Sequence, residues 1–124
     1  MRGSKGETRL SAGPAIAGPA AVWGRVPAMP AYVIAYTGDF RDQAALEEYR
    51  RRNTDAVTNH GGRFIARGGA VEVLEGPWPW ERCVVMEFPD AAAARAWHAS
   101  DEYAPLKAIR QAASTTQIIL VEGL

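Results

Sequence analysis

The residues on which many functional sites depend are scarce in this sequence. It contains one cysteine, Cys83, and two histidines, His60 and His98, and the three show no metal-ligand spacing. A single cysteine excludes an internal disulfide. The lack of an internal disulfide is typical of a cytoplasmic protein. Because Cys83 lies within an apolar stretch, we expect a core residue rather than a nucleophile. The sequence therefore predicts neither a metal site nor a disulfide-stabilised fold.

The chain also lacks an excess of charge and a long apolar run. Its 14 basic and 14 acidic residues give a net charge of zero, which argues against a general nucleic-acid-binding surface. No apolar stretch approaches the roughly 20 residues of a membrane-spanning helix. Glycine pairs at 61–62 and 68–69 lack the spacing and the lysine of a phosphate-binding loop. We expect no nucleic-acid partner, no membrane partner and no cofactor.

The first 28 residues differ in composition from the rest of the chain. They are rich in glycine, alanine and proline, and four basic residues stand there against one acidic residue. Prolines would break any helix, and Gly18-Pro19 interrupts the one weakly apolar stretch, which argues against a secretion signal. We expect residues 1–28 to form a disordered extension and residues 29–124 to form one folded domain.

From residue 29 onward the sequence pattern alternates between strand and helix. β-Branched and aromatic residues predict strands over 31–36, 63–67, 82–88 and 116–122. Apolar residues at helical spacing predict a helix of about five turns that begins at Asp42. A second helix, capped by Asp90, runs to His98, and Ser100 caps a further helical segment.

Two glycine pairs are expected to interrupt these elements. Gly61-Gly62 should end the first helix, with Gly61 in the left-handed conformation. Gly68-Gly69 should bend a long strand that resumes over 71–74. Residues 75–80, which include two tryptophans, should form a hairpin tip.

The predicted order, β-α-β-β-α-(α)-β, is that of an α+β ferredoxin-like fold. Right-handed crossovers place all helices on one face of a four-stranded antiparallel sheet. The strands are apolar on both faces, however; residues 118–121, for example, are all apolar. A bare apolar face would exceed what soluble monomers usually expose. We therefore predict a homodimer in which two sheets pack face to face.

Several short motifs run through the chain from Met29 to Leu124. They include His60-Gly61-Gly62-Arg63-Phe64, Arg67-Gly68-Gly69, Val73-Leu74-Glu75-Gly76, Glu87-Phe88-Pro89, Ala94-Arg95-Ala96-Trp97 and Leu120-Val121-Glu122-Gly123. This set resembles the family known as domain of unknown function 1330. The resemblance implies the dimeric α/β-barrel superfamily, whose members include cofactor-independent monooxygenases, isomerases, haem enzymes and binding proteins. Fold analogy alone therefore selects no activity, and His98 stands where the resemblance leads us to expect a tyrosine.

In a barrel of this type, a ligand cavity lies between the helices and the sheet. The residues predicted to face it are His60, Arg67, Glu87, Trp97, Tyr103 and Arg110. The imidazole of His60 has the chemistry of a general base, but at a helix end it also suits capping of the last carbonyls. Trp97 and Tyr103 suit the wall of an aromatic site and suit a plain core equally.

The charged candidates also have two interpretations. Arg67 suits a bidentate clamp for a carboxylate or an oxyanion, and Glu87 suits a base. Glu87 could instead form a structural pair with Arg67 or with Arg110. The basic run at 50–52 lies beside acidic residues, which is typical of a solvated helix face rather than a phosphate site.

Two hypotheses for the function follow. In the first, a homodimer binds a small anionic or aromatic molecule between its helices and its sheet. In the second, the protein is a cofactor-independent enzyme of monooxygenase or isomerase type. Here His60 or Glu87 would take a proton and Arg67 would hold the resulting oxyanion.

Overall fold

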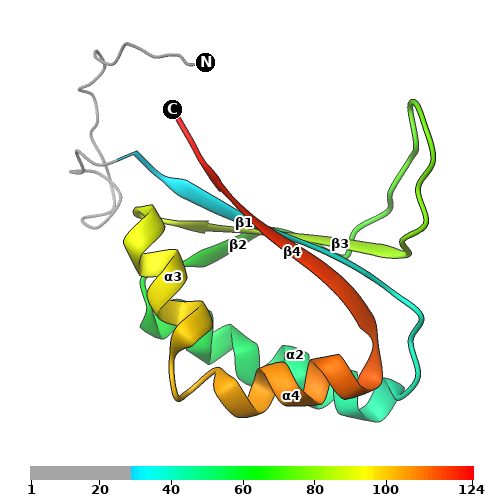
Figure 1. Ribbon diagram of the computed structural model, residues 1–124, viewed down its shortest axis with the longest axis horizontal. Coiled ribbons are helices and arrows are strands. Elements are labelled where there is room, and N and C mark those ends of the chain that lie inside the picture. Colours follow the sequence, from blue (N-terminus) through cyan, green and yellow to red (C-terminus); the bar gives the residue numbers. More distant parts are fainter. Residues whose placement is uncertain (1–28) are drawn as a thin grey trace.

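Four strands and three helices follow one another along the residues described by the computed structural model, 29–124 (Figure 1). In chain order they are β1 (Ala31–Gly38), α2 (Gln43–Asn59), β2 (Arg63–Arg67), β3 (Arg82–Phe88), α3 (Ala91–Ala99), α4 (Ala104–Ala113) and β4 (Thr115–Glu122). All four predicted strands are present. The predicted extension, residues 1–28, lies outside the described residues.

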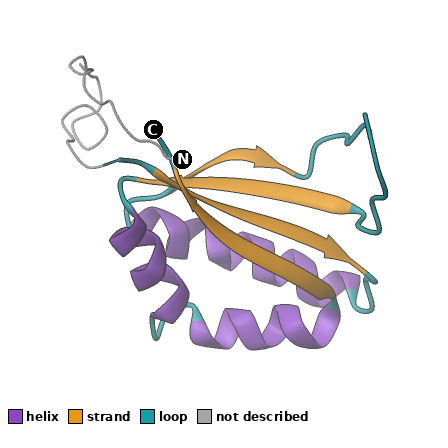
Figure 2. Ribbon diagram, turned by 45° about the horizontal axis from the view of Figure 1, so that its top comes forward, coloured by secondary structure: helices purple, strands orange, loops and turns teal. Residues whose placement is uncertain are grey.

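The strands form one antiparallel sheet in the order β2-β3-β1-β4. All three helices cover the same face of this sheet (Figure 2). The predicted ferredoxin-like fold is therefore confirmed. None of the helices among residues 29–124 is long and apolar enough to cross a membrane.

Side-chain caps set the helix boundaries much as the sequence predicts. The Asp42 carboxylate accepts a hydrogen bond from the Ala45 amide at 3.0 Å, and Asp90 caps α3 in the same way at 2.8 Å. Beyond α2, Gly61 adopts the predicted left-handed conformation, with φ of 83°. Gly62 leaves room for a ring, because an added Cβ would lie 2.6 Å from Phe88.

Large apolar side chains fill the space between the helices and the sheet. They include Val33, Val57, Met86, Phe88, Trp97, Tyr103 and Leu106. Trp97 and Tyr103 have no exposed surface. Burial of one such side chain contributes roughly 1.5–3 kcal/mol to stability, so this layer supplies much of the fold's driving force.

The other face of the sheet carries no layer from the described chain. Strand register places Tyr32, Ile34 and Tyr36 of β1 on this face, level with Val85 of β3 and Ile119 of β4. We call this surface the open face. Many of its side chains are apolar and only partly buried, as the sequence pattern predicts, and Arg63, Glu87 and Gln117 also lie on it.

The predicted continuation of β2 over residues 71–74 is wrong. Gly68, with φ of 76°, ends the strand, and β3 begins only at Arg82. Residues 69–80, here called the arm, project beyond the sheet (Figure 1). Within the described residues the arm makes no backbone hydrogen bond. An extended segment needs a neighbouring strand to pair with, and no strand of residues 29–124 pairs with residues 71–74.

Candidate functional site

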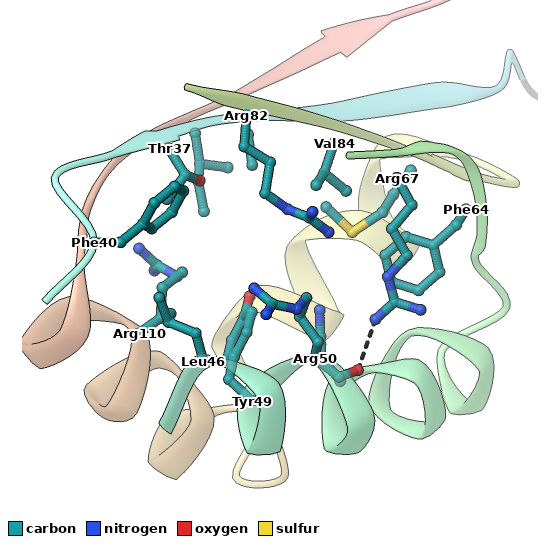
Figure 3. Close-up of a pocket in the computed structure, with 14 residues that line it drawn as sticks. Thr37, Phe40, Leu46, Tyr49, Arg50, Phe64, Arg67, Arg82, Val84 and Arg110 are labelled. Atoms are coloured by element: carbon teal, nitrogen blue, oxygen red, sulfur yellow. Dashed lines mark hydrogen bonds between the residues drawn. The ribbon is translucent and has the colours of Figure 1, made fainter. Parts of the chain in front are cut away.

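A small pocket lies between α2, α4 and the helix-covered face of the sheet (Figure 3). Its volume of about 40 Å³ leaves room for a few water molecules. It is lined by Ala35, Thr37, Phe40, Leu46, Tyr49, Arg50, Asn53, Phe64, Arg67, Arg82, Val84, Met86, Arg110 and Ile118. Four of these residues are arginines, and none is aspartate, glutamate, histidine or cysteine. We call it the arginine pocket.

The arginines reach the pocket from four different elements. Arg50 rises from α2, Arg110 from α4, Arg67 from the end of β2, and Arg82 from the start of β3 (Figure 3). Among residues 29–124, no carboxylate forms an ion pair with any of them. The pocket therefore concentrates positive charge that the described chain does not balance.

An irregularity in β2 brings Arg67 to the pocket. Phe64 pairs with Met86, but Ala66 and not Ile65 pairs with Val85, so the strand contains a bulge. Without the bulge, residues 64 and 66 would share a face and Arg67 would point to the open face. With it, Phe64 and Arg67 both face the helices.

Arg67 is held in place by its neighbours. Its guanidinium donates to the Thr54 hydroxyl at 2.9 Å and to the Arg50 carbonyl at 2.6 Å, and it lies 3.8 Å from the centre of the Phe64 ring. Burial and the positive charge of Arg82 lower the pKa of Arg67 from its usual value. The fold therefore holds the guanidinium of Arg67 close to the positively charged side chain of Arg82.

Arg82 packs against a glycine. A Cβ added to Gly68 would lie 1.9 Å from a terminal guanidinium nitrogen of Arg82, so a larger residue there would displace the end of the Arg82 side chain. Burial and the charge of Arg50 lower the pKa of Arg82. Its side chain has no hydrogen-bond partner within the described residues, and it hangs from the sheet into the pocket (Figure 3).

Arg110 is the most enclosed of the four. It is 7 % exposed, and its Nε donates to the Tyr103 hydroxyl at 3.3 Å. That hydroxyl is 2.8 Å from the Tyr49 hydroxyl, and burial raises the pKa of Tyr49 far above its usual value. The Tyr49 hydroxyl also interacts with the Arg110 guanidinium, which points into the pocket (Figure 3).

The predicted aromatic residues lie one layer behind the pocket. Tyr103 contacts the pocket through Tyr49 and Arg110, as described above. Trp97 donates from Nε1 to the Asn53 amide oxygen at 3.1 Å, and Asn53 lines the pocket. Both aromatics therefore position pocket residues, while Phe40 and Phe64 supply the aromatic surface of the wall itself.

His60 and Glu87, the predicted bases, do not line the pocket. The His60 ring nitrogen Nδ1 lies 2.8 Å from the Ala56 carbonyl oxygen at the end of α2, the geometry of the capping alternative. Glu87 accepts two hydrogen bonds from Arg63, at 2.8 and 3.0 Å, and one from the Tyr32 hydroxyl at 3.1 Å.

The expected pairing of Glu87 with Arg67 or Arg110 is therefore wrong. Strand register places Glu87 opposite Arg63 on β2 and Tyr32 on β1, and all three lie on the open face. Arg67 and Arg110 lie on the helix-covered face. The sheet itself separates the carboxylate from the two arginines.

Sequence reasoning missed two of the four pocket arginines, although both leave a signal. Arg82 stands two residues before Val84, so it shares the inward face of β3. Arg50 follows Leu46 by four residues and therefore lies at the edge of the buried stripe of α2. Arg51, by contrast, pairs with Glu48 on the exposed side, as the mixed charges predict.

No three histidine, cysteine, aspartate or glutamate side chains of residues 29–124 come together as metal ligands would.

Comparison with known proteins identifies the family of the chain. A family model, DUF1330, described as a domain of unknown function, matches residues 30–124. The chain belongs to this family. The resemblance of its short motifs is thereby confirmed.

Solved structures of the same fold resemble this DUF1330 protein at low sequence identity. A protein of unknown function from Rhodopseudomonas palustris is 20 % identical over 79 % of this chain and 85 % of that one, with a TM-score of 0.64. SnoaB, a cofactor-independent oxygenase from Streptomyces nogalater, is 19 % identical over 76 % and 91 %, with a TM-score of 0.51. None of the curated proteins matches the chain. These similarities establish the fold alone.

Proposed function

We propose that this DUF1330 protein binds a small anionic molecule in the arginine pocket. The observation that carries the proposal is the set of four arginines with no carboxylate among the lining residues. A buried cation is costly unless it is paired. An oxyanion would supply that pairing through charge-assisted and bidentate hydrogen bonds, which are stronger than neutral ones.

The apolar lining suits the rest of such a ligand. Val84, Met86 and Ile118 form a floor on the sheet, and Phe64 stands beside Arg67. A planar or short aliphatic body would rest on this floor while its charged end meets the guanidinium groups. This arrangement supports an aromatic or small aliphatic acid rather than a sugar or a polyol.

Calorimetry with a panel of aromatic acids and 2-keto acids tests the proposal. Arg67→Met should weaken binding at least about tenfold, because hydrogen bonds to charged groups contribute about 1.5–3 kcal/mol. Arg51→Met is the matched control, since Arg51 lies on the exposed side of the same helix as Arg50. Equal weakening in both variants, or no binding by any acid, would contradict the proposal.

A second candidate is a cofactor-independent enzyme of monooxygenase or isomerase type. The shared fold with SnoaB supports it. In this proposal Arg67 stabilises an oxyanion. Of the two predicted bases, Glu87 lies across the sheet from Arg67, which leaves His60 to receive the proton, and the Glu87 variant below serves as a control. Turnover measured in His60→Ala and Glu87→Gln, beside binding of the same substrate, tests this role. Unchanged turnover in both variants would remove His60 from the mechanism.

We also propose that the chain forms a homodimer through the open face. No helix or strand of the described residues covers the apolar side chains there, and a contiguous patch of this kind is usually buried by a partner. The arm extends the same surface, because the Trp78 ring packs edge-on against Tyr36 at 5.6 Å. Along the arm Val73 is 49 % and Leu74 is 88 % exposed. Replacing Val71, Val73 and Leu74 together by serine should weaken the dimer, as measured by sedimentation.

A further inference from the structure

The arginine pocket offers hydrogen-bond donors and almost no acceptors. Guanidinium groups donate only. The Asn53 amide oxygen already accepts from Trp97, so its NH₂ group, another donor, remains available. Only the hydroxyls of Thr37 and Tyr49 can act either way. A ligand that must itself donate, such as an amide or a protonated acid, would leave these groups unsatisfied.

The charge of the pocket exceeds what one negative charge can balance. Four guanidinium groups line it, and those of Arg50 and Arg82 have no hydrogen-bond partner among residues 29–124. Arg110, 7 % exposed, points its guanidinium into the cavity. A monoanion pairs bidentately with one arginine at a time and would leave the others repelling one another.

We propose that the ligand is a dianion, with two negative charges carried on oxygen atoms, of the size of a short dicarboxylate or a small phosphate monoester. This inference rests on the proposed anion-binding function. Both ligand types are acceptors only, and both present enough oxygen atoms to engage arginines from opposite walls. In this arrangement Arg110 and Tyr49 meet one end of the ligand, and Arg67 and Arg82 meet the other (Figure 3).

The first experiment compares malonate with propanoate by calorimetry at constant ionic strength. The two differ in that a methyl group of propanoate is a second carboxylate in malonate. Malonate should bind at least about tenfold more tightly, since each charged hydrogen-bonding group adds appreciably to affinity. Equal affinities would overturn the dianion inference and leave the proposed anion site intact. If neither acid nor any other anion binds, the proposed function itself fails.

Titration of the ligand gives an independent measurement. Methyl phosphate, whose second pKa is about 6, is mainly a monoanion at about pH 5 and a dianion at about pH 7.5. Its affinity should therefore rise by up to about tenfold between those pH values, while the affinity of sulfate, a dianion at both, should change little. A flat profile for methyl phosphate would overturn the inference. Tight binding of malonate with none of methyl phosphate would restrict the class to dicarboxylates.

A charge-removing variant locates the effect. Arg82→Gln should weaken malonate binding several times more than it weakens propanoate binding, because the second charge has lost its partner. Arg51→Gln, on the exposed side of α2, is the matched control and should change neither. Thermal unfolding of each variant shows that the fold is kept. Equal weakening of both ligands by Arg82→Gln would mean that Arg82 does not read the second charge, which contradicts the proposed arrangement.

Discussion

The two faces of the sheet treat buried charge in opposite ways. On the open face, the carboxylate of Glu87 is nearly enclosed and satisfied by Arg63 and by the Tyr32 hydroxyl. On the helix-covered face, burial and the charge of Arg82 lower the pKa of Arg67, burial and the charge of Arg50 lower the pKa of Arg82, and no carboxylate of the described chain lines their pocket. On the open face, the buried carboxylate finds both its cation and its hydrogen-bond donors within the chain, which is typical of a structural pair. The second has no balancing carboxylate among residues 29–124, which is the basis of the proposed anion site.

The largest effect is expected from a charge placed on the open face. Ile34→Lys would bury an ammonium group in the proposed dimer interface, at a cost of about 3–5 kcal/mol if it finds no partner. The dimer should therefore dissociate at least about a hundredfold more readily in sedimentation equilibrium. Gln111→Lys, on the exposed surface of α4, is the control. A wild-type protein that sediments as a monomer would refute the interface.

The same substitution on the two faces should have opposite consequences for stability. Arg63→Met leaves the Glu87 carboxylate without its cation and should lower the free energy of unfolding by about 1–3 kcal/mol. Arg82→Met removes one of several mutually repelling cations and adds apolar surface. It should leave the ligand-free protein equally stable or more stable, while weakening anion binding.

Urea unfolding without added anions, followed by calorimetry, measures both quantities. If Arg82→Met destabilises the protein as much as Arg63→Met does, the pocket arginines are structural and the contrast between the faces fails. The predicted pattern is a stability gain coupled to a binding loss, which is common for residues that serve a site.

The sequence predicts the fold far better than the site, and particular residues explain why. Strand limits and helix caps depend on local chemistry, such as the carboxylates of Asp42 and Asp90, so they can be read directly. The position of Arg67 depends on a bulge at Ile65, which changes the face of every later residue in β2. No local signal marks that bulge. The partner of Glu87 likewise depends on register between strands, and register is set by the whole sheet.

Arg50 and Arg82 could have been found from the sequence by stricter use of periodicity. Each lies in phase with buried neighbours, Leu46 in one case and Val84 in the other. What periodicity cannot supply is their convergence, since it requires α2 and the start of β3 to line the same pocket. The arm is the reverse case: its alternation of Val71 and Val73 is real, but a strand pattern forms a strand only where a partner exists.

A smaller effect, of about 1 kcal/mol, should follow from Gly68→Ala. The substitution forces a side chain into the left-handed region, with φ of 76°, and it also displaces the Arg82 guanidinium. We expect lower stability and weaker anion binding together. Gly69→Ala is a closely matched control, because an added Cβ there meets nothing within 4 Å. Loss of stability with unchanged anion affinity would show that Arg82 does not need its position against Gly68 in order to bind.

The smallest expected effect is a loss of folding stability at acid pH that depends on His98 of α3. The pKa of His98 responds to the charge of the pocket residue Arg110. Burial, followed by the charges of Lys107 and Arg110, lowers the pKa of His98 below its usual value of 6.5. Above that pH the residue is neutral in both folded and unfolded chains. As pH falls below about 6.5, the unfolded chain gains a proton that the folded chain resists, so stability declines until the folded pKa is reached.

His98→Tyr and His98→Gln should both flatten this decline in urea unfolding measured from about pH 7.5 to pH 5. Because Arg110 contributes to the shift, Arg110→Met should make the decline shallower while leaving His98 in place. A decline that persists unchanged in His98→Gln would assign the acid sensitivity to another group.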